Sequence, residues 1–218
     1  MIRVVAALVL AFALVGCGSS DDQVVVSAAS SLTEVFGALE AAYEEADPEL
    51  DIVLNLGGSA ALREQILGGA PADVFAPASW EHMEAVSDQA MGAPVPFASN
   101  SMVIATTAGN PAGIVDVADF ADPEPYLGAC AESVPCGALA AEVFEAAGIA
   151  PELDTEETSV RALLTKVEAG DLDAGIVYST DVLVADVDAI VIPDDANAVT
   201  QYPIARLSED PGAAGFVA

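Results

Sequence analysis

The stretch VVVSAASSLTEVFGALEAAYEEA, residues 24–46, decides the fold class. Its opening, residues 24–28, is a short and largely apolar run, as in strands that are buried on both faces. From residue 32 to residue 46 the apolar side chains recur at helical spacing. Hydroxyl side chains, Ser31 among them, gather where the strand passes into the helix. A buried strand that leads directly into a helix predicts the repeating unit of an α/β protein.

The same alternation continues along the chain. Further strands are predicted at residues 51–56, 72–78, 101–108, 126–130, 174–180, 189–193 and 200–207. Helices are predicted at residues 59–67, 79–86, 137–148 and 159–170, and a last helix is expected to open after Asp210-Pro211. We expect that helical segment to continue beyond residue 218.

Two shifts in composition, at residues 94–96 and 186–193, predict that the chain crosses twice between two lobes. Residues 24–98 and 187–218 are assigned to the first lobe, and residues 99–186 to the second. The fold class is therefore α/β, with largely parallel sheets in two lobes.

Composition excludes several classes of partner. The formal net charge is -30, from 5 Lys and Arg against 35 Asp and Glu. Nucleic acid is a poor partner because phosphate contacts need Lys and Arg, and an anionic membrane surface is equally poor. Hydrophobic residues make up 54% of the chain, so it can form a packed core and is not expected to be disordered.

The N-terminus predicts export. One basic residue, Arg3, precedes an apolar run too short to span a bilayer, and the run ends in Leu14-Val15-Gly16-Cys17. This ending looks like a lipobox, so residues 1–16 are predicted to be a lipoprotein signal peptide and Cys17 the lipidated residue. Residues 17–23 then form a polar tether on the outer face of the cell membrane. The alternative is an ordinary signal peptide or anchor helix with an incidental cysteine.

Two further cysteines, Cys130 and Cys136, lie close together in CAESVPC. Outside the cytoplasm such a pair can form a disulfide, and the other interpretation is two free thiols. The spacing is not that of a zinc site, and no histidine lies nearby in the sequence.

Several predicted helices begin with residues suited to an anion. Ser31 and Glu34 form a Ser-x-x-Glu capping box, which by itself explains the serine. The functional alternative is that free amides and hydroxyls at such helix starts bind an anion. Similar helix starts follow in the sequence at Ser59, Cys136, Ser159 and Val160, and Tyr178 lies near the C-terminal end of a strand. In open α/β sheets that is the edge where ligands bind.

The order of these motifs resembles the molybdate-binding proteins of ABC importers. The resemblance covers roughly residues 24–207, and its most specific pieces are GAPADVF (69–75) and VEAGDLDAGIVYSTD (167–181). It implies the two-lobed periplasmic-binding-protein fold of type II, in which a tetrahedral dianion lies between lobes that close on it.

The resemblance also implies a ligand-binding set. Ser31 and Ser59 are the hydroxyl and amide donors of the first lobe, and Cys136, Val160 and Tyr178 are the donors of the second. Cys136 stands where the family usually has an alanine that gives its backbone N–H. Molybdenum would enter as molybdate, through oxygens that these donors bind, with no direct metal ligand and no cofactor.

Donor chemistry agrees with the resemblance. A fully deprotonated oxyanion needs only hydrogen-bond donors, so the acidic composition is no obstacle. Phosphate at neutral pH carries a proton that a donor-only site leaves unpaired. Sulfate is discriminated from molybdate and tungstate by size, and a sulfate receptor remains the alternative.

Other functions are less favoured by the sequence. Ser59 lacks the final glycine of a nucleophile elbow, and His82 is predicted to be a solvated helix residue, so no hydrolase is indicated. A cation-binding lipoprotein is a weaker alternative because the carboxylates are scattered along the sequence. The sequence thus predicts a monomeric, non-enzymatic receptor that delivers molybdate to a membrane permease.

Overall fold

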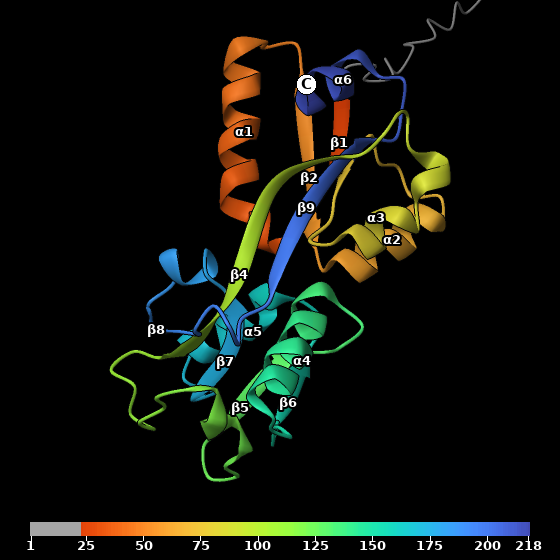
Figure 1. Ribbon diagram of the computed structural model, residues 1–218. Helices are drawn as coiled ribbons and strands as arrows, with labels where there is room; N and C mark the ends of the chain where they lie inside the picture. The colour runs from red at the N-terminus through yellow and green to blue at the C-terminus, as the bar shows by residue number, and fades with distance from the viewer. Residues whose placement is uncertain (1–22) are drawn as a thin grey trace, which may run out of the picture.

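The computed structural model describes residues 23–218. Two lobes are joined by two long strands, β4 (Val95–Thr107) and β9 (Val199–Arg206) (Figure 1). The predicted signal peptide (1–16), the lipidation site Cys17 and most of the tether (17–23) lie outside the described residues. Among residues 23–218, no helix combines the length and the apolarity needed to cross a membrane.

The first lobe is built on a sheet with the order β2-β1-β3-β9. Strand β1 pairs in parallel with β2 and β3, and β9 runs antiparallel to β3. The strands are β1 (Gln23–Ala29), β2 (Asp51–Gly57), β3 (Val74–Ala76) and β9 (Val199–Arg206). The helices are α1 (Thr33–Ala46), α2 (Ser59–Leu67), α3 (Trp80–Glu84) and α6 (Pro211–Val217). Helix α1 lies on one side of this sheet, and α2 and α3 lie on the other (Figure 1).

The second lobe has a similar sheet, with the strand order β4-β7-β5-β6. Strand β5 pairs in parallel with β7 and β6, and β4 runs antiparallel to β7. The strands are β4 (Val95–Thr107), β5 (Leu127–Cys130), β6 (Thr155–Glu157), β7 (Ala174–Tyr178) and β8 (Val187–Val191). The helices are α4 (Pro135–Ala147) and α5 (Val160–Glu168). Every residue of β7 is buried, as expected for an apolar strand covered on both faces.

Strands β4 and β9 cross between the lobes. They pair with each other in antiparallel fashion over Val95–Ser101 and Val199–Ile204. The sequence predicted β4 to begin only at residue 101, because its first half is exposed and lacks the apolar pattern of a buried strand. This paired half is the segment that links the two lobes in Figure 1.

The boundary between the lobes needs one revision. The sequence assigned everything from residue 187 onward to the first lobe. Strand β8, however, pairs with Val103–Thr107 of β4, the half that also pairs with β7. We therefore assign residues 187–191 to the second lobe and propose that the chain returns to the first lobe within β9.

Two local predictions were wrong. Ser31 does not cap α1: the chain forms a 3-10 helix at Ser30–Leu32, and α1 then starts at Thr33 without a side-chain cap. His82 is not solvated but 2% exposed, and its Nδ1 lies 3.1 Å from Arg63 Nη1. Burial lowers the pKa of His82, and the charge of Arg63 adds to the lowering, so the ring is neutral at pH 7. Its Nδ1 then accepts a hydrogen bond from the guanidinium group of Arg63.

Candidate functional site

A narrow cavity between the lobes collects all five residues that the family resemblance assigned to the ligand. Three helix starts, those of α2, α4 and α5, meet there with the 3-10 helix and the end of β7. The lining residues are Ser30, Ser31, Gly57, Gly58, Ser59, Ala78, Val134, Pro135, Cys136, Thr158, Ser159, Val160 and Tyr178. None of these thirteen is Lys, Arg, His, Asp or Glu, so the lining offers polar donors without a charged side chain.

Ser59 opens α2 and is 2% exposed. Its Oγ accepts a hydrogen bond of 3.0 Å from the backbone N–H of Ala78. A serine hydroxyl has one proton and two lone pairs, and this bond uses a lone pair. The proton of Ser59 therefore remains for a ligand in the cavity.

Ser31 follows β1 and is half-buried. Its Oγ lies 3.0 Å from the hydroxyl of Tyr202, a residue of β9 that is 171 positions away in the sequence. Tyr202 could not be assigned to the site from the sequence, because a period-two strand pattern indicates only that this side chain is buried. The contact replaces the predicted capping bond of Ser31.

Tyr178 ends β7 and is 1% exposed. Its hydroxyl has no hydrogen-bond partner among the described residues. Burial raises the pKa of this phenol well above its usual value, so the proton is retained at neutral pH. A buried hydroxyl without a partner is costly, and an acceptor in the cavity would remove that cost.

Cys136 and Val160 contribute backbone groups rather than side chains. Both lie in the first turn of a helix, where N–H groups have no intrahelical acceptor. No backbone hydrogen bond of the described chain uses either N–H. The partial positive charge of the two helix starts adds to this donor surface.

The first turn of α4 is fixed in several ways. Cys136 is disulfide-bonded to Cys130 at the end of β5, with 5.6 Å between the two Cα atoms. Pro135 occupies the first helical turn, where its missing N–H costs nothing. A Cβ on Gly137 would lie 1.9 Å from the carbonyl oxygen of Ala131, so only glycine fits this turn so close to the preceding loop.

Asp181 lies behind Tyr178 and was not identified from the sequence. It is 2% exposed, and its Oδ2 accepts the backbone N–H of Tyr178 at 3.0 Å. Burial raises the pKa of Asp181 to about 7, the amide of Tyr178 and Arg161 oppose the rise, and Glu34 adds to it. This carboxyl group therefore titrates near neutrality.

Two contacts cross the cleft from lobe to lobe. Arg161 Nη2 lies 2.6 and 2.7 Å from the two carboxylate oxygens of Glu34. A Cβ on Gly58 would lie 2.3 Å from the carbonyl oxygen of Thr158. The absence of a side chain on this glycine therefore allows the opposite lobe to approach. The lobes are thus closed on each other.

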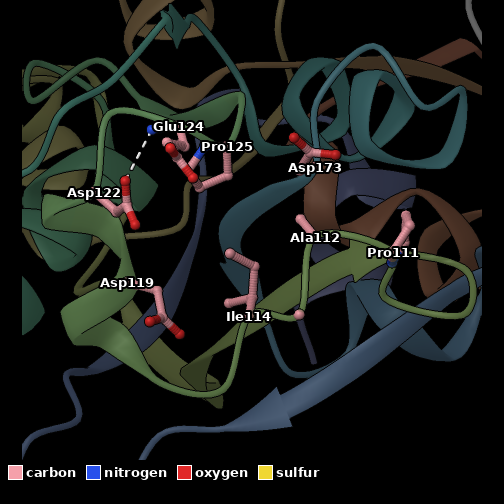
Figure 2. A pocket seen from close by; sticks show the side chains of 9 residues that line it. Pro111, Ala112, Ile114, Asp119, Asp122, Glu124, Pro125 and Asp173 are labelled. Atoms are coloured by element: carbon pink, nitrogen blue, oxygen red, sulfur yellow. Dashed lines mark hydrogen bonds between the residues drawn. The ribbon is translucent and has the colours of Figure 1, made fainter.

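A second hollow, at the far end of the second lobe, is acidic (Figure 2). Its carboxylates belong to Asp119, Asp122, Glu124 and Asp173. Asp119 accepts from Val115 N at 2.6 Å, Asp122 from Glu124 N at 2.9 Å and Asp173 from Tyr126 N at 2.8 Å. Asp119 and Asp122 therefore stabilise local turns, and Asp173 joins two segments that are 47 positions apart. Residues 23–218 contain no cluster of side chains suited to a metal ion.

Comparison with known proteins agrees with this geometry. The chain matches the family model "Bacterial extracellular solute-binding protein" over residues 24–218. It is 36% identical over 224 residues to the molybdate-binding protein ModA of Mycobacterium tuberculosis strain H37Rv, covering 94% of this chain and 86% of the relative.

Solved structures share the fold at lower identity. The periplasmic molybdate-binding protein of Azotobacter vinelandii superposes with a TM-score of 0.73 at 17% identity, covering 89% of this chain and 90% of the other. The sulfate-binding protein SubI of M. tuberculosis H37Rv gives 0.72 at 15% identity, covering 89% and 79%. The family is one of solute-binding proteins rather than enzymes. The chain therefore belongs to the bacterial extracellular solute-binding proteins, the family expected from its motifs.

Proposed function

We propose that this chain is the receptor of an ABC importer and that it captures molybdate, with tungstate as a second ligand. The observation that carries the proposal is a narrow cavity between the lobes, whose lining offers hydrogen-bond donors without a charged side chain. The 36% identity to a molybdate-binding protein supports the choice of anion.

Each donor has a role. The hydroxyls of Ser31 and Ser59 bind the oxyanion from the first lobe. The amides of Cys136 and Val160 and the hydroxyl of Tyr178 bind it from the second lobe. Fixed amides and hydroxyls stabilise a dianion strongly in a closed cleft, where the local dielectric constant is low.

The donor set also explains selectivity. A protonated phosphate would present its own O–H to groups that only donate, and the unpaired proton would cost affinity. Sulfate is fully deprotonated, so an unpaired proton cannot discriminate against it. We propose that sulfate binds more weakly because it is smaller than molybdate and makes less contact with the two walls of the cleft. Release then requires the lobes to separate by a hinge motion, which breaks the pair of Glu34 with Arg161.

Calorimetric titration of the chain from Ser19 onward tests the function directly. Molybdate, tungstate, sulfate and phosphate are added in turn at neutral pH. We expect tight binding of the first two and weak binding of the others. If sulfate bound as tightly as molybdate, the set of donors would stand but molybdate would be the wrong substrate. If none of the four anions bound, the proposal would be overturned.

The location and the partners follow from the same function. We propose that Cys17 carries a lipid that holds the receptor, as a monomer, on the outer face of the cell membrane beside its permease. No cofactor takes part, and no covalent bond of the ligand is broken. Cys17→Ala should move the protein from the membrane fraction to the soluble fraction, and unchanged membrane association would contradict the anchor.

A further inference from the structure

A hydroxyl that binds an oxyanion must have its proton free. For Ser59 the structure settles this point, because the N–H of Ala78 can only donate and so leaves the serine proton available. For Ser31 the geometry allows two arrangements, since its partner Tyr202 is also a hydroxyl and either oxygen can donate. Only the arrangement in which Tyr202 donates leaves the proton of Ser31 for the ligand.

The surroundings of Tyr202 fix its hydroxyl in place. The side chain is 1% exposed and contacts aromatic rings of β4 and β7, with centroids 6.3 Å from Phe97 and 6.0 Å from Tyr178. Tyr202 lies on β9, one of the two strands shared by the lobes, and it does not line the cavity. It therefore acts on a ligand through Ser31 rather than by direct contact.

We propose that Tyr202 is a positioning residue of the oxyanion site, whose hydroxyl donates to Ser31 Oγ and turns the serine proton toward the bound anion. Burial raises the pKa of Tyr202 to about 12, although polar neighbours, Ser31 first among them, oppose the rise, so the phenol keeps its proton at neutral pH. A bound dianion favours the same arrangement, because it accepts a proton from Ser31 and offers none in return.

The two serines of the first lobe then follow one rule. Each has a lone pair occupied by a fixed donor from another strand or loop, Ala78 N–H for Ser59 and Tyr202 O–H for Ser31. Each keeps a single proton for the ligand. The difference is that the donor to Ser31 is a side chain, so mutation can remove it.

The test is a double-mutant cycle read by molybdate titration of the full chain. Tyr202→Phe keeps the ring and removes the hydroxyl, and we expect the dissociation constant to rise by about 5- to 20-fold, the scale of one hydrogen bond. In a Ser31→Ala background the same substitution should cause no further change. Equal losses in both backgrounds would indicate only structural support by Tyr202 and would overturn the positioning role.

A matched control is available in the same lobe. Tyr43 donates its hydroxyl proton to the carbonyl oxygen of Gly215 at 2.9 Å, away from the cavity. Tyr43→Phe removes a comparable hydrogen bond, and molybdate affinity should not change. Tyr202→Met, which fills apolar space without a hydroxyl, is the second variant and must show the same dependence on Ser31.

The role of Tyr202 rests on the proposed function, and the experiment separates the two. A wild-type chain that binds none of the oxyanions would overturn both. A wild-type chain that binds molybdate, with unchanged affinity in Tyr202→Phe, would overturn the role of Tyr202 alone.

Discussion

The two walls of the cleft present hydrogen-bond donors in different ways. The wall of the first lobe uses side-chain hydroxyls, Ser31 and Ser59, each oriented by one bond. The wall of the second lobe uses backbone amides at the starts of α4 and α5, together with the buried phenol of Tyr178. Mutation of a side chain can therefore remove the first wall's donors, whereas the second wall's amides are lost only when the backbone moves.

The largest expected effect comes from removing both hydroxyls of the first wall. The double substitution Ser31→Ala/Ser59→Ala should weaken molybdate binding by about 1.5–3 kcal/mol per charge-assisted hydrogen bond. Isothermal titration measures the loss. Near-normal affinity in this variant would mean that the anion binds elsewhere and that the hydroxyls of the first lobe do not form one wall of its site.

Behind the second wall, the buried carboxyl group of Asp181 titrates near neutrality. Burial raises the folded-state pKa of Asp181 to about 7, well above the unfolded value. The unfolded chain therefore loses this proton first, and the free energy of unfolding should fall as the pH rises from about 4 to about 7, by at most about 4 kcal/mol. Denaturant unfolding of wild type and of Asp181→Asn across this range isolates the effect, since the variant lacks this titration. Identical pH profiles would show that Asp181 titrates normally.

The disulfide tests how firmly the backbone of the second wall is held. Cys130→Ser/Cys136→Ser should lower the free energy of unfolding by about 2–3 kcal/mol, from the chain entropy of a short loop. Molybdate affinity should fall less than in the double serine variant, because the amide of residue 136 remains. Titration of the unreduced wild type should find no thiol at either position. Two reactive thiols would contradict the bridge.

Contact between the walls depends on a glycine. Gly58→Ala places a Cβ against the carbonyl oxygen of Thr158 and should oppose closure at a cost of about 1–3 kcal/mol in binding. The free energy of unfolding of the ligand-free protein should change less than the binding free energy, because the lobes can separate by a hinge motion and relieve the clash. Gly37→Ala is the matched control, since a Cβ there meets nothing within 4 Å. Normal affinity in Gly58→Ala would mean that closure does not bring these segments together.

The smallest expected effect is that of the ion pair across the cleft. The side chains of Arg161 and Glu34 are 31% and 46% exposed, so the pair should contribute under about 1 kcal/mol. Glu34→Gln should weaken binding slightly at low ionic strength, and the difference from wild type should vanish in high salt. A large loss that salt does not reduce would indicate that Glu34 does more than bridge the walls.

Much of the fold was predictable from local pattern. The buried run at 24–28, the helical spacing of 32–46 and Asp210-Pro211 each predicted an element that the structure contains. The exposed half of β4 escaped prediction because its pairing with β9 shows no buried alternation. The sequence assigned strand β8 to the first lobe, and we propose the second, because sequence order does not reveal which half of β4 this strand pairs with.

The residues of the candidate site likewise divide into those that local sequence motifs predicted and those that depend on contacts between distant segments. Ser31, Ser59, Cys136, Val160 and Tyr178 came from motifs near helix starts and a strand end, and the structure gathers them around one cavity. Tyr202, Asp181 and the pair of Glu34 with Arg161 depend on contacts between distant segments. No spacing rule could have found them. The capping box of Ser31 failed for the same reason, since a distant tyrosine engages its hydroxyl.

The most direct test of the central claim is a crystal structure of the chain grown with molybdate and measured at the molybdenum absorption edge. We expect one strong anomalous peak between the walls, with oxygens within hydrogen-bonding distance of Ser31, Ser59, Tyr178 and the amides of Cys136 and Val160. A peak outside this cavity, or a bound anion that contacts only one wall, would contradict the account.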